Sequence, residues 1–147
     1  MSTPMIFMVV LTGVLAVLVG VLGYRLWHLR QGGTAAILRD TPAVGGHGWR
    51  HGVVRYHGGE AVFYRLSSLR WWPDRRLSRR GLEILSRRAP RGDEFDIMTE
   101  EIVVLELRDS SPDRRRGYEL ALDRGALTAF LSWLESRPNP RARGRSV

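Results

Sequence analysis

The residues with the clearest capacity for chemistry are arginines in the middle of the chain. Residues 65–91 contain nine arginines and only two acidic residues, Asp74 and Glu83. An arginine guanidinium is a planar fork that binds two oxygens of a phosphate or carboxylate at once. Two tryptophans beside the arginines could enter the headgroup layer of a membrane. The candidate patch for anionic lipid or a partner comprises Arg70, Trp71, Trp72, Arg75, Arg76, Arg79, Arg80, Arg87 and Arg88.

The same arginines could instead form an ordinary solvated surface. All 23 basic residues of the chain are arginine, a bias that GC-rich codons would also produce. The acidic residues between Asp93 and Glu106 could pair with part of the basic region and neutralise it. The sequence therefore leaves two interpretations open, an anion-binding patch and a solvated surface.

No residue set predicts catalysis or metal binding. The chain has no cysteine and no lysine, which excludes disulfides, thiolate ligands, cysteine nucleophiles and Schiff-base lysines. Three histidines can bind zinc or copper, but the spacing of His47, His51 and His57 matches no known ligand pattern. The acids of residues 93–106 could hold a cation, although a solvated acidic segment that faces the basic region is the expected arrangement. We expect no catalytic residue, no metal ion, no cofactor and a non-enzymatic function.

An uncharged segment near the N-terminus predicts a membrane-spanning helix. Residues 1–24 carry no charged side chain, and from Met5 to Tyr24 only Thr12 and three glycines lie outside the apolar set. About 20 such residues suffice to cross the hydrocarbon core of a bilayer as a helix. We expect a transmembrane helix over residues 5–27. The expected membrane-interface anchors are Tyr24, Arg25, Trp27 and Arg30.

The arginines that follow this segment predict its orientation. Arg25, Arg30 and Arg39 lie after the apolar run, and none lies before it. By the positive-inside rule, we expect residues 1–4 to be exoplasmic and the domain after the transmembrane helix to lie in the cytoplasm, at the inner (plasma) membrane. A cleaved signal peptide is the alternative, but it would need a basic start, a shorter apolar run and a small-x-small cleavage site.

Small residues recur at every fourth position of the predicted span, namely Thr12, Ala16 and Gly20. Such a stripe lets two helices approach closely within a membrane. Small residues are also common in membrane helices that make no such contact. The stripe is therefore a candidate contact for a second copy of the chain or for another membrane protein.

The remainder of the chain reads as a linker followed by a small β-domain. Residues 28–48 are rich in glycine and small residues without a sustained period, which predicts a flexible juxtamembrane linker. Regular alternation begins at Trp49, and short strands separated by turns favour an antiparallel sandwich or barrel. The expected strands are 49–57, 61–67, 70–72, 81–88, 101–109 and 117–123.

The last element changes to the period of an amphipathic helix. Four apolar residues follow the i, i+3, i+4, i+7 spacing: Leu127, Phe130, Leu131 and Leu134. Asp123 is the expected N-cap, Trp133 lies near the edge of the apolar stripe, and Pro138 ends the helix. The helix would close one end of a curved sheet and complete a domain over residues 49–136. Residues 137–147 are expected to form a disordered basic tail.

Several stretches resemble one family of proteins. They are the N-terminal anchor, RYHGGEAVFYRLSSLRWWPDRRLSRRGLEILSRRAP, GYELAL and ALTAFLSWLESRP. The chain resembles, over almost its full length, short single-pass actinobacterial membrane proteins of the domain of unknown function 2550 type. This resemblance implies a membrane anchor and supplies no catalytic residue. Separately, the order of several antiparallel strands and one C-terminal helix resembles the pleckstrin-homology-like superfold.

These features together predict a membrane-anchored interaction or scaffold module. A domain held near the inner leaflet encounters anionic lipid at high effective concentration, and each arginine close to that surface contributes about 1 kcal/mol. The expected partners are anionic lipid headgroups or an acidic membrane-protein surface. The alternative is an accessory single-pass subunit of a larger inner-membrane complex. Nucleic-acid binding and enzymatic activity are least favoured, because an anchor restricts access to nucleic acid and no nucleophile–base set is visible.

Overall fold

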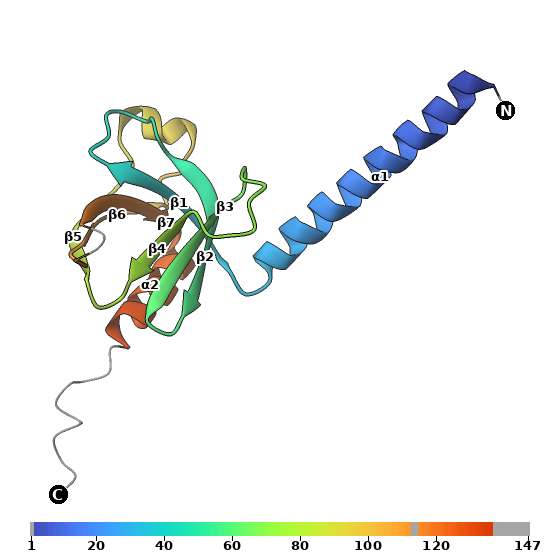
Figure 1. Cartoon of the computed structure of the whole chain (residues 1–147). Coiled ribbons are helices and arrows are strands. Elements are labelled where there is room, and N and C mark those ends of the chain that lie inside the picture. The colour runs from blue at the N-terminus through green and yellow to red at the C-terminus, as the bar shows by residue number, and fades with distance from the viewer. Residues whose placement is uncertain (1, 113–114, 137–147) are drawn as a thin grey trace, which may run out of the picture. The chain divides into compact units, whose positions relative to one another are not determined.

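The computed structural model describes residues 2–112 and 115–136, without the side chains of residues 29 and 30. The predicted tail over residues 137–147, including Pro138, lies outside the described residues. The chain divides into two units, Met1–Gly32 and Gly33–Val147 (Figure 1). The first unit is a single helix, and the second is a sheet with a helix packed on it.

The first unit is the helix α1, Thr3–Arg30. Its segment Thr3–His28 is 26 residues long and apolar enough to span a membrane. At a rise of about 1.5 Å per residue the segment is about 39 Å long, which exceeds the thickness of about 30 Å of the hydrocarbon core. Apolar side chains surround the helix on every side and are exposed, the pattern of a helix that faces lipid. The helix ends where Gly32 adopts a left-handed conformation with φ +81°. The predicted N-terminal apolar helix is confirmed.

Only residues 31–33 separate α1 from the first strand, β1 (Thr34–Thr41). The predicted flexible linker over residues 28–48 is therefore wrong, because it contains a complete strand. β1 is central in the sheet and pairs with β2 (Arg50–His57) on one side and β7 (Arg116–Leu122) on the other. A central strand that is buried on both faces has no alternation of apolar and polar residues, and this is why its sequence reads as irregular.

Seven antiparallel strands form one curled sheet, a half-barrel, in the order β4-β3-β2-β1-β7-β6-β5 (Figure 1). The remaining strands are β3 (Glu60–Arg65), β4 (Arg75–Ser78), β5 (Leu82–Arg88) and β6 (Val103–Asp109). The prediction of an antiparallel β-domain followed by one helix is confirmed. The sheet is continuous, so the domain resembles an open barrel more than a sandwich of two sheets.

The predicted strand over residues 70–72 is wrong. These residues lie in the loop between β3 and β4, and the strand begins only at Arg75, after Pro73. Tryptophan favours strands because it packs well on a half-buried sheet surface. In this loop, however, both Trp71 and Trp72 are exposed, so that reason for strand formation is absent.

The C-terminal helix α2 (Arg124–Glu135) packs on β1 and β7 over the inner face of the sheet. The carboxylate of Asp123 accepts a hydrogen bond of 2.7 Å from the Ala126 N–H, which confirms the predicted N-cap. Phe130 and Trp133 are buried, whereas Leu131 is only partly buried. The buried face of α2 is therefore rotated from the predicted leucine stripe towards Trp133.

The loop between β5 and β6 covers part of the opposite face of the sheet and contains the short 3-10 helix η1 (Gly92–Asp96). A second, smaller apolar cluster lies on this face and consists of Trp49, Met98, Val104 and Ala121. Neighbouring residues of β6 thus point into two different cores, since Leu105 belongs to the larger cluster beneath α2. Both faces of the sheet are buried where β6, β7 and β1 lie together.

Candidate functional site

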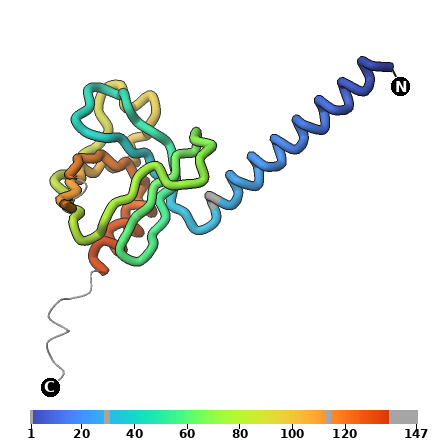
Figure 2. Tube along the Cα trace, viewed as in Figure 1, coloured from blue at the N-terminus to red at the C-terminus, as the bar shows by residue number. Residues whose placement is uncertain are grey.

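The most exposed apolar side chains of the β-domain include those of the loop between β3 and β4, residues 66–74. Leu69, Trp71 and Trp72 are 79%, 73% and 63% exposed, although large aromatic side chains are usually well covered. The guanidinium of Arg70 lies 5.9 Å from the centroid of the Trp72 ring. The loop projects from the end of the sheet, in the green segment that follows β3 (Figure 2). We call residues 66–74 the tryptophan loop.

Hydrogen bonds fix both ends of the tryptophan loop. The Leu66 N–H donates to the carbonyl of His51 at 3.0 Å, which continues the pairing with β2. At the far end, the Asp74 N–H donates to the Phe63 carbonyl at 2.9 Å. The Asp74 carboxylate in turn accepts the Arg65 N–H at 2.9 Å. The two stems are therefore closed on each other, and the exposed side chains are carried on a defined base.

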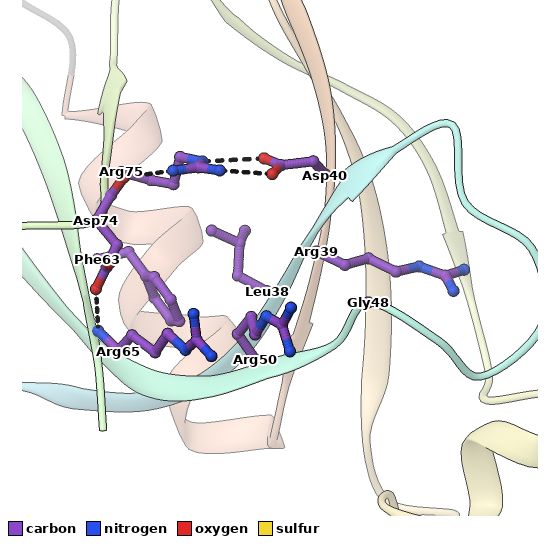
Figure 3. A pocket seen from close by; sticks show the side chains of 9 residues that line it. All are labelled: Leu38, Arg39, Asp40, Gly48, Arg50, Phe63, Arg65, Asp74 and Arg75. Atoms are coloured by element: carbon purple, nitrogen blue, oxygen red, sulfur yellow. Dashed lines mark hydrogen bonds and ion pairs between the residues drawn. The ribbon is translucent and has the colours of Figure 1, made fainter. Parts of the chain in front are cut away.

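A pocket of about 290 Å³ lies at the base of the tryptophan loop (Figure 3). Its walls include Arg50, Arg65 and Arg75 from three neighbouring strands, with Leu38 and Phe63 as apolar residues between them. The guanidinium of Arg75 binds both oxygens of Asp40, at 3.0 and 2.6 Å. This pairing, which outweighs the partial burial of the carboxyl, holds the pKa of Asp40 below its usual value, so Asp40 stays ionised at neutral pH.

A second charged cluster is buried against the opposite face of the sheet. Arg39 and Arg88 alternate there with Glu94 from η1 and Glu119 from β7. Arg88 donates to Glu94 at 2.6 and 2.8 Å and to Glu119 at 2.8 Å, and Arg39 bonds both carboxylates. The Arg39 guanidinium also lies 4.5 Å from the centroid of the Trp49 ring. We call these four charged residues the ion cluster.

Pairing within the ion cluster favours the charged forms of its members. Hydrogen bonds from the Arg88 side chain, opposed by desolvation and assisted by the Arg91 N–H, hold the pKa of Glu94 below its usual value. The bonds to Glu94 and Glu119 likewise raise the pKa of Arg88, against the effect of burial. Because the pKa of Glu94 is depressed on folding, its contribution to stability is present at neutral pH and is lost as the pH falls below about 4.5.

The structure divides the arginines of the predicted patch among several places. Arg75 pairs with Asp40, and Arg76 lies 3.6 Å from Glu60 on the sheet surface. Arg79 donates to Ser136 Oγ at 2.8 Å. Arg88 belongs to the ion cluster, and its side chain is only 15% exposed. The members of the predicted set with exposed side chains are Arg70, Trp71, Trp72, Arg76, Arg80 and Arg87.

Sequence reasoning missed Arg39, Arg50, Arg65 and Glu119 as members of these two charged sites. Glu94 was expected to be solvated with its acidic neighbours, but it is 3% exposed and bonds two arginines. No local pattern marks these residues, because their partners lie up to 80 residues away along the chain. The other acids of that run are exposed as predicted: Asp93, Asp96, Glu100, Glu101 and Glu106.

The histidines do not converge on a metal site in the part of the chain that the structure describes. His47, His51 and His57 are exposed. Among residues 2–112 and 115–136, no group of three or more His, Cys, Asp or Glu side chains is placed to hold a metal ion. His28 lies on α1, with its ring centroid 5.9 Å from that of Tyr24.

The predicted membrane residues all lie on α1. Tyr24 and Trp27 are 60% and 58% exposed near the end of the apolar segment, with ring centroids 6.3 Å apart. The residues of the small stripe, Thr12, Ala16 and Gly20, are exposed along the helix. Arg25 follows Tyr24, and the side chain of Arg30 is outside the described part. This arrangement places aromatic side chains where a membrane interface would lie.

The sequence matches known proteins over its whole length. It is 80% identical to the uncharacterized protein Rv1312 of Mycobacterium tuberculosis (strain H37Rv) and 74% identical to the uncharacterized protein ML1147 of Mycobacterium leprae, in both cases over 147 residues and 100% of each chain. The sequence profile of the family described as protein of unknown function (DUF2550) matches residues 10–140. The resemblance drawn from the sequence is confirmed, and the chain belongs to the DUF2550 family.

Proposed function

We propose that this chain is a single-pass membrane protein whose β-domain docks on an anionic bilayer through the tryptophan loop. The observation that carries the proposal is the exposure of Leu69, Trp71 and Trp72 on one loop beside Arg70. Exposed apolar patches on a soluble domain mark surfaces that contact a membrane or another protein. Tryptophan favours the headgroup layer, and arginine favours anionic lipid.

The short connection to α1 supports a membrane rather than a distant partner. Residues 31–33 alone join α1 to β1, and an extended chain rises at most about 3.6 Å per residue. The start of β1 therefore lies within about 14 Å of the end of α1 in any orientation of the domain. A domain on so short a tether meets the bilayer surface at a high effective concentration.

The energies involved are sufficient for docking in this tethered setting. Each arginine near an anionic surface contributes about 1 kcal/mol, and burying one large apolar side chain contributes about 1.5–3 kcal/mol. The tryptophan loop offers two tryptophans, one leucine and one arginine. Because the anchor already holds the domain at the membrane, even part of this energy shifts the equilibrium towards the docked state.

We further propose that the β-domain lies in the cytoplasm, acts without catalysis and is pleckstrin-homology-like. The arginine after the apolar segment, Arg25, supports the orientation through the positive-inside rule. The cytoplasmic leaflet also carries the anionic lipids that the loop would contact. Seven antiparallel strands followed by one helix is the element order behind the pleckstrin-like assignment, which is an analogy of fold.

Quenching of tryptophan fluorescence by brominated lipid tests the docking proposal. The full chain with Trp27→Phe, which removes the tryptophan of the anchor, is placed in nanodiscs of anionic phosphatidylglycerol or neutral phosphatidylcholine. We expect strong quenching in anionic nanodiscs, because Trp71 and Trp72 enter the lipid, and weaker quenching in neutral ones. Arg70→Gln should weaken docking only on anionic lipid, by about fivefold, which corresponds to about 1 kcal/mol.

The matched variants distinguish docking from background quenching. Trp71→Ser combined with Trp72→Ser should abolish most of the lipid-dependent signal, whereas Phe95→Ser, which removes another exposed aromatic ring, should leave it unchanged. Equal quenching in the parent chain and the double variant would contradict the proposal. The domain would then contact a protein partner or remain in solvent.

A further inference from the structure

The inner face of the sheet changes from apolar to charged along four neighbouring strands. The buried apolar residues of this face on β1 to β4 include Leu38, Val54, Phe63 and Leu77. The charged residues on the same face of the same strands are Asp40, Arg50, Arg65 and Arg75. The pairing places Leu38 beside Arg50 and Phe63 beside Arg75. The charged residues therefore collect at one end of the half-barrel.

The helix α2 covers the other end of this face. Trp133 Nε1 donates to the carbonyl of Gly58, in the turn between β2 and β3, at 3.0 Å. The charged end lies at the opposite ends of β2 and β3, where the pocket opens beneath the tryptophan loop. At Gly52 a Cβ would stand 2.4 Å from Cζ of Phe63, so only glycine lets the Phe63 ring approach β2 this closely. This ring forms an apolar wall of the pocket.

Two guanidinium groups of the pocket, those of Arg50 and Arg65, form no salt bridge in the part of the chain that the structure describes. Asp40 is bound by Arg75, and the carboxylate of Asp74 accepts the backbone N–H of Arg65. Arg65 Nε donates to Ser67 Oγ at 2.7 Å. Besides the hydrogen bonds from Arg75, the charge of Arg50 helps to lower the pKa of Asp40, but within the described residues neither Arg50 nor Arg65 forms a salt bridge, and Asp40 is occupied by Arg75. Figure 3 shows their side chains below Phe63 and Leu38, whereas Arg39 extends away towards the ion cluster.

We propose that this pocket binds a phosphate monoester, held by the guanidinium groups of Arg50 and Arg65 and bordered by the Arg75–Asp40 pair. Arginine forks match phosphate oxygens and hold them bidentately. Arg65 and Asp74 form both the stems of the tryptophan loop and the walls of the pocket. The inference deepens the proposed function, on which it rests in one respect: docking of the loop would bring the pocket to the phosphate layer of the membrane.

The phosphate could belong to a lipid headgroup or to a soluble ester, and two arms of one experiment distinguish these sources. The full chain in neutral nanodiscs is treated with phenylglyoxal, which modifies accessible guanidinium groups, and each arginine is followed by mass spectrometry. In the first arm, glycerol 3-phosphate or inorganic phosphate is added. In the second, the nanodiscs contain phosphatidic acid, which has a terminal phosphate monoester, or phosphatidylglycerol, which has none, at equal mole fraction.

We expect a bound phosphate monoester to slow the modification of Arg50 and Arg65 by phenylglyoxal, relative to neutral nanodiscs without ligand. The modification rates of Arg108 and Arg124 should not change. Protection by glycerol 3-phosphate in neutral nanodiscs assigns the pocket to phosphate esters in general. Protection only by phosphatidic acid, and not by phosphatidylglycerol, assigns it to a lipid headgroup. If Arg50 and Arg65 are modified at the same rate with and without every ligand, the proposal is overturned. Equal protection by phosphatidic acid and phosphatidylglycerol would also overturn it, because such a result reports only a general attraction to anionic lipid.

Variants test the same pocket by calorimetric titration of the protecting ligand. Arg50→Gln combined with Arg65→Gln should weaken binding by about tenfold or more, because it removes both charge-assisted forks. The matched control, Arg108→Gln combined with Arg124→Gln, removes the same charge from exposed sites and should change affinity by less than about twofold. If Arg65→Gln impairs folding, the single variant Arg50→Gln is compared with the control instead, because Arg50 is exposed. Equal loss in both double variants would overturn the proposal.

Failure of the pocket and failure of docking give different results. The quenching of Trp71 and Trp72 by brominated lipid depends on the tryptophan loop and not on Arg50. Quenching without protection of Arg50 and Arg65 would therefore leave docking intact and exclude the phosphate pocket. Protection by glycerol 3-phosphate without quenching would retain the pocket and exclude docking of the loop.

Discussion

Replacement of Arg39 by methionine is expected to lower the free energy of unfolding of the β-domain by about 3–5 kcal/mol. The Arg39 side chain is 6% exposed and bonds Glu94, Glu119 and the Gly45 carbonyl. Methionine fills similar space but leaves two buried carboxylates with one guanidinium, that of Arg88. An uncompensated buried charge is among the most destabilising changes in a protein interior. Urea unfolding of residues 33–147, which contain the whole sheet, measures the loss.

Two further variants make the Arg39 result specific. Arg76→Met removes an exposed arginine that lies 3.6 Å from Glu60, and a surface pair of this kind contributes about 0–1 kcal/mol. Adding Glu119→Gln to Arg39→Met leaves one positive charge, on Arg88, and one negative charge, on Glu94. The double variant should therefore lose less free energy of unfolding than the sum of the losses of the two single variants. A loss for Arg39→Met no larger than that for Arg76→Met would contradict the role of the ion cluster.

Replacement of Phe130 by alanine is expected to cost about 3–5 kcal/mol. Phe130 is fully buried where α2 packs on the sheet, and its ring centroid lies 5.8 Å from that of Trp133. Its removal would leave a cavity between helix and sheet that rigid strands cannot close. Leu131→Ala is the matched comparison, because Leu131 is only partly buried and should cost about 1–2 kcal/mol. Urea unfolding of the same fragment compares the two, and a larger loss for Leu131→Ala would contradict the observed packing.

Patterning predicted those elements whose residues meet different surroundings on their two sides. The one-sided stripe of α2 is such a case, and so is β6, in which Leu105 and Leu107 are buried while Glu106 and Arg108 are exposed. The helix α1 was predicted instead from the length of its uncharged apolar run. In α2 and β6 the period of apolar residues reports the geometry of the element. Antiparallel β-structure with one closing helix could therefore be predicted from the sequence.

The features that could not be predicted from the sequence are those that depend on contacts with distant parts of the chain. β1 is a central strand because β2 and β7 pair with its two edges, and its residues show no alternation because apolar clusters cover both of its faces. Glu94 is buried because η1 folds back over Arg39 and Arg88. Local composition included the exposed residues Arg70, Trp71 and Trp72 in the predicted patch, but it could not separate them from arginines that pair with acids elsewhere in the fold.

The depth of Leu69 in the membrane tests the central claim most directly. The chain has no cysteine, so Leu69→Cys provides a single site for a spin label, and His57→Cys provides an exposed control in β2, near its turn into β3. Electron paramagnetic resonance of the full chain in anionic nanodiscs compares collisions with oxygen, which enriches in lipid, and with a nickel chelate, which stays in water. We predict that the label at residue 69 lies below the phosphate layer while the label at residue 57 remains in water. A label at residue 69 that is as accessible to the nickel chelate as the label at residue 57 would contradict docking through the tryptophan loop.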